Sequence, residues 1–463
     1  MKVLDNKQWA IETFQDCELG DLRRTKRLMK VAESMVDAPE QSLPGQFSEW
    51  RDLKAAYRFF DTEQATFEAI GTPHWMQTRN TKPGRYLLIS DTTDLNFTAH
   101  HSTQGLGMLG DGKGRGFQLH PCLMYSLDGK QVVGLAGAVT YYRAFKPKNE
   151  TRAQRLARHR ESDIWGNVVD QVGSAPEGSQ WIHVFDRGGD YFEAMCHIKM
   201  TDNDWVIRAS KLNRTVINCR GEKVKLSEAV SEATELGDFT MDLRSTPRHA
   251  ARTAMLKISY CEVTFPAPVH KSPWLKKCQI KNLTMRVVIA KEVDPPKGNK
   301  PICWIILTSL PVESLADAWS VLEYYEYRWM IEEYNRVAKS GCSIETHALR
   351  TAERLEPIVG LTSIIAVRLL QLKLIGRNQP EAKAATHVPS TWLQGLKLMR
   401  PRIRLTEMTV YEFFRQLAMV GGFLGRKHDG EPGWQTIWRG YRKLHQTNVG
   451  IALGKRLKLK NCG

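Results

Sequence analysis

Two aspartates each stand directly after a short apolar segment, where a carboxylate could take part in chemistry. Asp91 follows residues 86–90, and Asp186 follows residues 181–185. Such short apolar runs predict buried strands, and open α/β sheets bind ligands at the carboxyl ends of their strands. One acid in such a place is common by chance, whereas two indicate a shared site.

A third carboxylate, Glu332, falls on a predicted helix that begins at Ser314 and runs to about residue 340. At about 100° per residue, one side of this helix collects its aromatic and charged residues, namely Tyr325, Arg328, Glu332, Arg336 and Lys339. Apolar residues collect on the opposite side, so the helix could pack on a sheet while the polar side faces a site. The alternative interpretation is an ordinary amphipathic helix with Glu–Arg pairs four residues apart.

Brought together, Asp91, Asp186 and Glu332 would supply the oxygen ligands that Mg²⁺ or Mn²⁺ prefers. Two such ions can hold the attacking and the leaving oxygen of a phosphodiester. The neighbouring cations would hold the phosphate backbone. These residues therefore favour metal-dependent cleavage or transfer of DNA strands.

The composition also points to a polyanionic partner. The chain has 463 residues, and 66 Lys and Arg against 50 Asp and Glu give a net charge of +16. The nine cysteines include no Cys-x-x-Cys pair, which disfavours a disulfide framework and a cysteine zinc site. No signal peptide and no membrane span are predicted, which favours a cytoplasmic protein.

The cations are concentrated near the start of the chain. Asp21 is a plausible N-cap, and Arg23, Arg24 and Arg27 follow it in the opening turns of a predicted helix. Cations are unfavourable at the positive end of a helix dipole, and a phosphate backbone would offset that. This helix is a candidate DNA contact; a solvated basic surface is the alternative.

The pattern along the chain predicts an α/β protein with helical ends. Residues 1–75 are expected to be mostly helical. Residues 76–365 are expected to form an α/β domain with a polar helix at about 150–173 and an all-β insertion at about 240–310, whose last strand could rejoin the main sheet. Residues 366–463 are expected to be helical and basic.

The spacing Tyr325-x-x-Arg328-x-x-x-Glu332 followed by Lys339 resembles the Y-R-E-K signature of the bacterial DDE transposases of insertion-sequence family four. Further similar segments are spread over nearly the whole chain: residues 19–25, 295–341, 366–372 and 421–423 with Trp434. The resemblance implies a ribonuclease-H-like catalytic core with an all-β insertion, flanked by a helical DNA-binding domain and a helical C-terminal dimerisation domain.

The same resemblance implies a cut-and-paste transposase. Such an enzyme nicks transposon ends with water, forms and reopens a hairpin, and joins the ends to target DNA. It would use two Mg²⁺ ions at Asp91, Asp186 and Glu332, with Mn²⁺ as a substitute. Its partners would be double-stranded DNA (terminal inverted repeats and target DNA) and a second copy of the chain in the synaptic complex. In a bacterium it would lie in the cytoplasm, at the nucleoid.

The resemblance also implies DNA contacts. Trp304 would stack on a base flipped out at the hairpin, although on its own it is also a plausible core residue of an Ile/Leu-rich strand. The other implied contacts are basic or aromatic: Arg23, Arg24 and Arg27 for the ends, and Arg208, Tyr325, Arg328, Arg336 and Lys339 for phosphates. Arg336 replaces a lysine, and Phe192 stands where the family has a histidine, so no histidine is expected at the site.

Two other functions remain open. A metal-dependent nuclease of the same fold would cut DNA without joining it, and a non-catalytic relative would only bind it. Three intact carboxylates disfavour a pure binding protein. Terminal inverted repeats flanking the reading frame would favour the transposase over the nuclease.

Overall fold

The computed structural model describes residues 3–460 apart from 145–146, 148, 244–250, 297–300, 379 and 427. The chain opens with helices, as predicted: α1 (Asn6–Phe14), α2 (Leu22–Asp37), α3 (Trp50–Phe60) and α4 (Phe67–Arg79). Asp21 caps α2 by accepting a hydrogen bond from the backbone N–H of Arg23. The predicted N-cap is therefore confirmed.

A mixed sheet follows, and among the described residues it contains 13 strands. Its first strands are β1 (Arg85–Ser90), β2 (Thr93–Asn96), β3 (Gly107–Leu109), β4 (Gly114–Ser126), β5 (Gln131–Tyr141), β6 (Gln180–Phe185) and β7 (Asp204–Arg208). The apolar segments 117–125 and 131–137, separated by a turn at 127–130, predict a hairpin, and the structure confirms it as β4 with β5. Strands β1, β6 and β7 are neighbours and run parallel. These pairings put the carboxyl ends of three buried strands at one edge.

The second half of the sheet comes from a long excursion: β8 (Thr215–Asn218), β9 (Lys223–Lys225), β10 (Thr234–Leu243), β11 (Arg252–Pro266), β12 (Asn282–Val293) and β13 (Cys303–Thr308). As expected, its last strand rejoins the main sheet, because β13 pairs with β7. The excursion begins before residue 240 and includes helices α8 (Leu226–Ser231) and α9 (Pro273–Cys278), so it is not all-β. The sequence Asp294-Pro295-Pro296-Lys297-Gly298 predicts a turn, of which Lys297 and Gly298 lie outside the described ranges.

The polar helix expected at about 150–173 is wrong in detail. The structure has α5 (Arg152–Ala157), a 3-10 turn η2 (Glu161–Asp163) and α6 (Ile164–Val172), followed after β6 by η3 (Arg187–Gly189) and α7 (Phe192–Met200). Helix α6 is largely buried because its apolar residues pack on β5. The polar residues before it disguised that apolar stripe.

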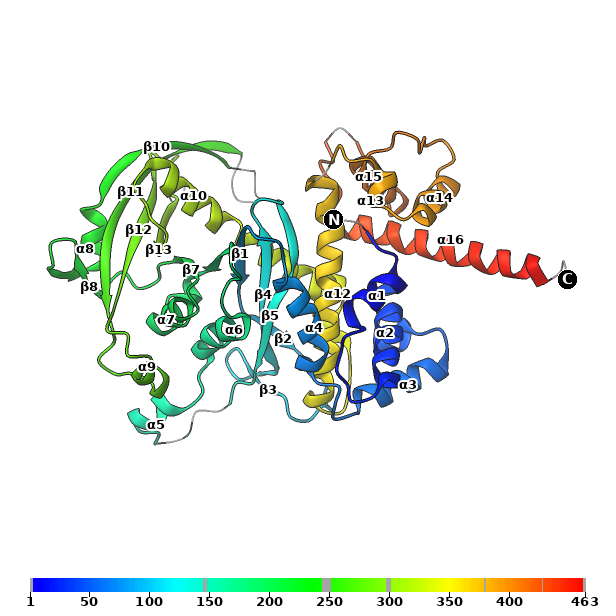
Figure 1. Ribbon diagram of the computed structural model, residues 1–463, viewed down its shortest axis with the longest axis horizontal. Helices are drawn as coiled ribbons and strands as arrows, with labels where there is room; N and C mark the ends of the chain where they lie inside the picture. Colours follow the sequence, from blue (N-terminus) through cyan, green and yellow to red (C-terminus); the bar gives the residue numbers. More distant parts are fainter. Residues whose placement is uncertain are drawn as a thin grey trace.

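The C-terminal part is helical, as expected. Its helices are α10 (Leu315–Glu326), α11 (Trp329–Arg336), α12 (Ala352–Asn378), α13 (Ala384–His387), α14 (Ser390–Met399), α15 (Val410–Val420) and α16 (Trp434–Lys460), with a π-turn η4 (Val337–Gly341) and a 3-10 turn η5 (Ile344–Thr346). Helix α12 runs between the sheet and the N-terminal helices, and α16 extends away from the body (Figure 1).

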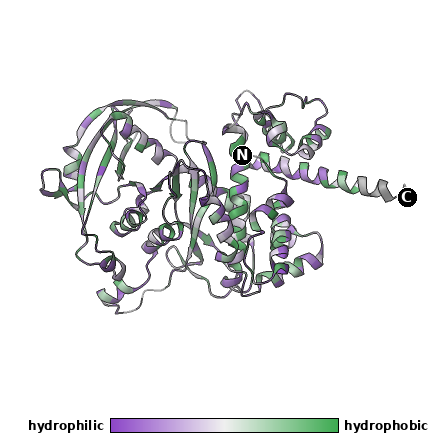
Figure 2. Ribbon diagram, viewed as in Figure 1, coloured by the Kyte–Doolittle hydropathy of each residue, from purple (hydrophilic) through white to green (hydrophobic). Residues whose placement is uncertain are grey.

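Helix α12 is the shared core element. It packs against β5, α4, α15 and α16. By length and composition its segment Ala352–Gly376 could cross a membrane, but 89% of the most apolar window is buried inside the protein. Figure 2 shows hydrophobic and hydrophilic segments mixed along both the strands and the helices. The apolar length of α12 is thus used inside the fold.

Arg368, which is buried on α12, should contribute strongly to stability. Its guanidinium donates to the carbonyl of Leu4 at 2.7 Å and to Oδ1 of Asn6 at 2.9 Å, and lies 5.0 Å from the ring of Trp9. Replacing Arg368 by Met removes the side-chain donor to the carbonyl of Leu4 and one of the two donors to Oδ1 of Asn6, which would keep only the hydroxyl of Tyr441. We expect the free energy of unfolding to fall by about 1–3 kcal/mol in urea denaturation.

Arg354→Met is the matched control on the same helix. Arg354 pairs with Asp61 at the surface, where ion pairs contribute about 0–1 kcal/mol. Equal decreases for the two variants would contradict the assignment of Arg368 as a buried anchor.

Candidate active site

The pairing of β1 with β6 determines where the two aspartates lie. In this parallel pair Ile89 is opposite Val184, an offset of 95 residues (184 − 89). The same offset carries Asp91 opposite Asp186 (186 − 91). Asp186 then caps η3 by accepting from the N–H of Gly188 at 2.6 Å. The two strand-end acids therefore meet at one edge of the sheet, as the sequence predicted.

Glu332 reaches the same place from α11, which packs against β1 and α12. Its Oε1 accepts a hydrogen bond of 2.6 Å from Nη2 of Arg328. Nη1 of Arg328 lies 3.6 Å from Oδ2 of Asp91. One guanidinium thus lies between a carboxylate of the sheet and a carboxylate of the helix.

The helix that carries these residues is not continuous, contrary to the prediction. Helix α10 ends at Glu326, and the N–H of Arg328 bonds the carbonyl of Tyr325 in a tight turn before α11 begins. A π-turn follows, in which the N–H of Cys342 bonds the carbonyl of Val337. A constant 100° step therefore misplaces the residues beyond the breaks.

Burial and the neighbouring charge of Asp186 raise the pKa of Asp91 to about 6. The N–H of Thr92 and the charge of Arg328 oppose this rise, while the charge of Glu332 adds to it. The three carboxylates are therefore close enough to repel one another. Repulsion of this kind is typical of sites that bind a cation.

Behind Asp91 lies a polar contact that the sequence did not single out. The N–H of Thr92 donates to Oδ1 of Asp91 at 2.8 Å, and the hydroxyl of Thr92 is 2.8 Å from Nδ1 of the buried His120. Burial lowers the pKa of His120 to about 3, so this imidazole is neutral. Thr92 and His120 therefore hold the backbone after Asp91 without adding charge.

Tyr325 is the centre of an aromatic and cationic cluster. Its ring lies 5.8 Å from that of Trp304 in an edge-on arrangement, 5.9 Å from the guanidinium of Arg208 and 5.8 Å from that of Arg328. Only 6% of Tyr325 is exposed, so it does not stand on an open polar face as expected. Trp304 is half-buried on β13. The structure thus brings these four predicted residues together.

The two remaining cations of the predicted helix face lie apart from that cluster. Arg336 is exposed and pairs with Glu333 at 3.1 Å, not with Glu332 as the amphipathic interpretation expected. Lys339, on the π-turn, donates to the carbonyl of Asp94 at 2.6 Å and lies 3.6 Å from Glu345. The breaks in the helix account for this separation.

The side chains of the three N-terminal arginines differ in exposure and in the contacts they make. The side chain of Arg23 is 90% exposed and contacts only its own cap residue, Asp21, among the described residues. Arg24 donates to the carbonyl of Leu19, and Arg27 pairs with Asp52 at 3.4 Å. Arg23 is therefore the member of this set that is most available to a partner.

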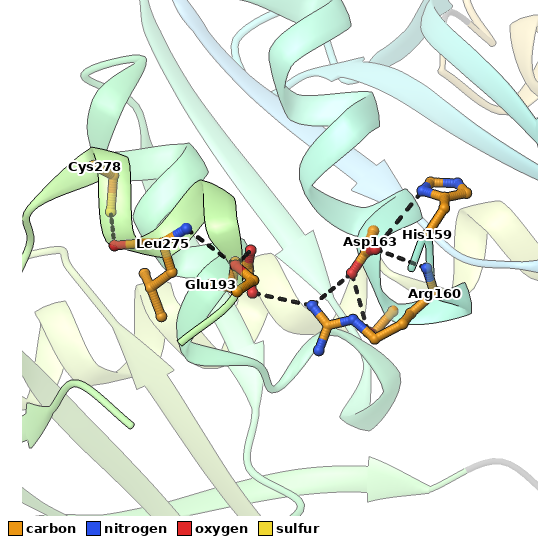
Figure 3. Close-up of polar contacts among 8 residues, drawn as sticks. His159, Arg160, Asp163, Glu193, Leu275 and Cys278 are labelled. Carbon is orange, nitrogen blue, oxygen red and sulfur yellow. Dashed lines mark hydrogen bonds and ion pairs between the residues drawn. The ribbon is translucent and has the colours of Figure 1, made fainter. Parts of the chain in front are cut away.

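A cleft of about 590 Å³ lies beside the loop that follows Asp186. Figure 3 shows Arg160 between Asp163 and Glu193, and Glu193 also accepts from Ser272, the cap of α9. Its lining holds as many Asp and Glu as Lys and Arg, and two of these cations, Arg160 and Arg214, pair with carboxylates of the same lining. It therefore offers no surplus charge for DNA.

Asp190, which also borders this cleft, ends the Asp-Arg-x-x-Asp pattern that begins at Asp186, a pattern that the family resemblance includes without giving Asp190 a role. Its buried carboxylate accepts from the N–H groups of Ser210 and Lys211 and pairs with Arg214. Asp190 therefore ties the loop after β7 to the loop that carries Asp186. Its spacing of four residues from Asp186 was the only available signal.

Within the described ranges, no three His, Cys, Asp or Glu side chains are arranged to hold a metal ion. The donor chemistry nevertheless fits a hard divalent cation, because three carboxylates approach closely enough to shift a pKa. What lies between two of them is the guanidinium of Arg328. Asp91, Asp186 and Glu332 remain the residues that could hold Mg²⁺.

The fold is a mixed α/β core with helical ends, and two of its strands are followed by aspartates. Two family models match the chain: "Transposase DNA-binding" over residues 6–65 and "Transposase Tn5 dimerisation domain" over residues 364–455. These two matches support a Tn5-like transposase, and the resemblance to insertion-sequence family four is consistent with them. The matches also support DNA binding and homodimer formation.

The raised pKa of Asp91 predicts that this residue costs stability at neutral pH. Because the folded protein binds the proton more tightly than the unfolded chain does, stability should fall as the pH rises from about 4 to about 6. Asp91→Asn should therefore raise the free energy of unfolding by on the order of 1–2 kcal/mol at pH 8 in EDTA. The gain should vanish near pH 4, where Asp91 is itself neutral.

Asp128→Asn is the control for this measurement. Asp128 is exposed and pairs with Arg85 at the surface, so its replacement should change stability by less than about 1 kcal/mol at either pH. A pH-independent effect of Asp91→Asn would show that burial of charge is not its cause.

Proposed function

We propose that this Tn5-like protein is a Mg²⁺-dependent DDE transposase with a ribonuclease-H-like core. It would cleave transposon ends through a hairpin and join them to target DNA. The observation that carries the proposal is the meeting of Asp91 and Asp186 at adjacent parallel strand ends, with Glu332 linked to Asp91 through Arg328. A protein that only binds DNA has no need of three repelling carboxylates.

Asp91, Asp186 and Glu332 would hold the metal. When bound, Mg²⁺ supplies a Lewis acid that activates water or a 3′-hydroxyl and stabilises charge on the phosphodiester. The chain's own cations would orient the strand: Arg208 and Arg328 flank the ring of Tyr325, and each guanidinium can hold a phosphate through two parallel hydrogen bonds. Lys339 and Arg336 would contact phosphates further along.

Trp304 fits the proposed hairpin step. It is half-buried, and its ring meets Tyr325 edge-on, so one side of the indole is anchored by the protein. Stacking on an aromatic ring contributes about 1–3 kcal/mol per base, which would help to hold an extruded base near the carboxylates. This arrangement supports a DNA role without excluding a packing role for the same side chain.

Two copies of the chain would synapse the transposon ends through the C-terminal helices. The dimerisation match covers most of α16, which extends from the body and exposes Val449 and Leu453 along its outer half. These two exposed apolar side chains, four residues apart on the helix, are suited to packing against a second copy. Joining of two ends to target DNA requires such pairing, whereas a standalone nuclease does not.

The central test uses a duplex that carries the inverted repeats flanking the gene. With Mg²⁺, a denaturing gel should resolve nicked, hairpin and joined strands. Asp186→Ala and Glu332→Ala should each lower cleavage by more than about 100-fold, because removal of a metal ligand exceeds the usual effect of an outer residue. Gel-shift binding of the duplex should persist.

Glu323→Gln, an exposed carboxylate on α10, is the control and should cleave normally. Cleavage retained by both Asp186→Ala and Glu332→Ala would refute the proposed site. Cutting without joining by the unaltered protein would favour the nuclease.

End binding should depend on Arg23. Arg23→Glu should weaken duplex binding and lower the slope of log affinity against log salt by about 0.9 for each phosphate that the protein no longer neutralises. Arg220→Glu is the same charge reversal at an exposed position after β8 and should leave both quantities nearly unchanged. Arg24 makes a poorer probe because it also bonds the carbonyl of Leu19. Unchanged affinity and slope in Arg23→Glu would refute a recognition role for α2.

A further inference from the structure

Arg328 contacts two of the carboxylates that the proposed metal ion would need as ligands. Its guanidinium makes a 2.6 Å hydrogen bond with Glu332 and lies 3.6 Å from Asp91, two carboxylates that come from different elements. Its side chain is only 16% exposed. In this arrangement one cation pairs with two of the three proposed metal ligands.

The local backbone holds Arg328 in that place. The tight turn between α10 and α11 positions its Cα, and the ring of Tyr325 lies 5.8 Å from the guanidinium. Burial is the largest single effect and opposes the charge, but the hydrogen bond to Glu332 and the neighbouring charges of Tyr325, Glu332 and Asp91 together outweigh it, so the pKa of Arg328 is raised and the group stays charged. The counter-cation is therefore built into the fold.

We infer that Arg328 is an exchangeable internal counter-cation, so that divalent metal and Arg328 compete for Asp91 and Glu332. This inference rests on the proposed function. A metal ion bound to both carboxylates would stand beside a buried positive charge, and the two cations would repel each other. Metal affinity is therefore low while the guanidinium remains on the carboxylates.

A DNA phosphate offers the guanidinium an alternative partner. Arg binds phosphate in the same forked geometry that it uses for carboxylate. A DNA strand whose phosphate binds Arg328 would leave Glu332 and Asp91 available to bind the metal ion. By linkage, DNA then raises metal affinity and metal raises DNA affinity by the same factor. The site would load metal mainly where a strand is in place, which limits stray cleavage.

The test measures Mn²⁺ binding to the full-length protein without DNA, by the electron spin resonance of free Mn²⁺. Arg328→Gln should bind Mn²⁺ on the order of tenfold more tightly than the unaltered protein. Arg336→Gln is the control. It removes a positive charge that pairs with Glu333 rather than with Glu332, and it should change Mn²⁺ affinity by less than about twofold.

A second arm adds the inverted-repeat duplex. It should raise the Mn²⁺ affinity of the unaltered protein, and raise it much less in Arg328→Gln. Arg328→Lys, which keeps the charge but lacks the fork that spans both carboxylates, should bind Mn²⁺ with intermediate affinity. If circular dichroism shows that the Gln variant does not fold, the comparison with the Lys variant decides.

Equal Mn²⁺ affinities in the unaltered protein and the variants would overturn the inference, as would an equal effect of DNA on the unaltered protein and Arg328→Gln. In either case strand cleavage by the unaltered protein could still stand, so the proposed function would survive. Absence of Mn²⁺ binding in every form, together with absence of cleavage, would overturn both.

Discussion

Parallel pairing of β1 with β6 is the constraint on which the site depends. Once Ile89 is opposite Val184, Asp91 and Asp186 are brought to one edge and cannot separate without breaking the sheet. Both strands are buried along almost their whole length, so a shift in register would disrupt the close packing of their side chains on both faces of the sheet. The sheet thus imposes electrostatic repulsion that the rest of the site must offset.

The residues that reduce this repulsion lie much later in the sequence. Helices α10 and α11 carry Tyr325, Arg328 and Glu332 back to the edge of the sheet, and β13 brings Trp304 and β7 brings Arg208 beside them. Without Arg328, Asp91 would lack one of the two interactions that hold its pKa down. The repulsion among the carboxylates and the guanidinium that partly offsets it therefore lie at the same site, as is common where a protein binds a cation.

Much of this arrangement could be predicted from residue order. Apolar runs that end in Asp91 and Asp186 indicated neighbouring strand ends, the Ser314 cap located the start of α10, and the Y-R-E-K spacing located Glu332. The breaks at Arg328 and at Val337–Gly341 could not be predicted, because they arise from tertiary packing that overrides a uniform helical repeat. For the same reason the burial of Tyr325 and the Arg336–Glu333 pair were missed. Helix α6 was missed because the polar residues before it disguised its apolar stripe.

The burial of helix α12 limits how the protein can be divided into fragments that fold on their own. Its apolar surface is covered on one side by the sheet, on another by α4 and on a third by α15 and α16. A segment that is hydrophobic all round needs every one of these neighbours to stay out of water. Expression of the DNA-binding segment, the sheet or the C-terminal helices alone would leave either that helix or its binding surfaces uncovered. Fragments divided at the matched boundaries are therefore prone to aggregate, although each carries a recognisable domain.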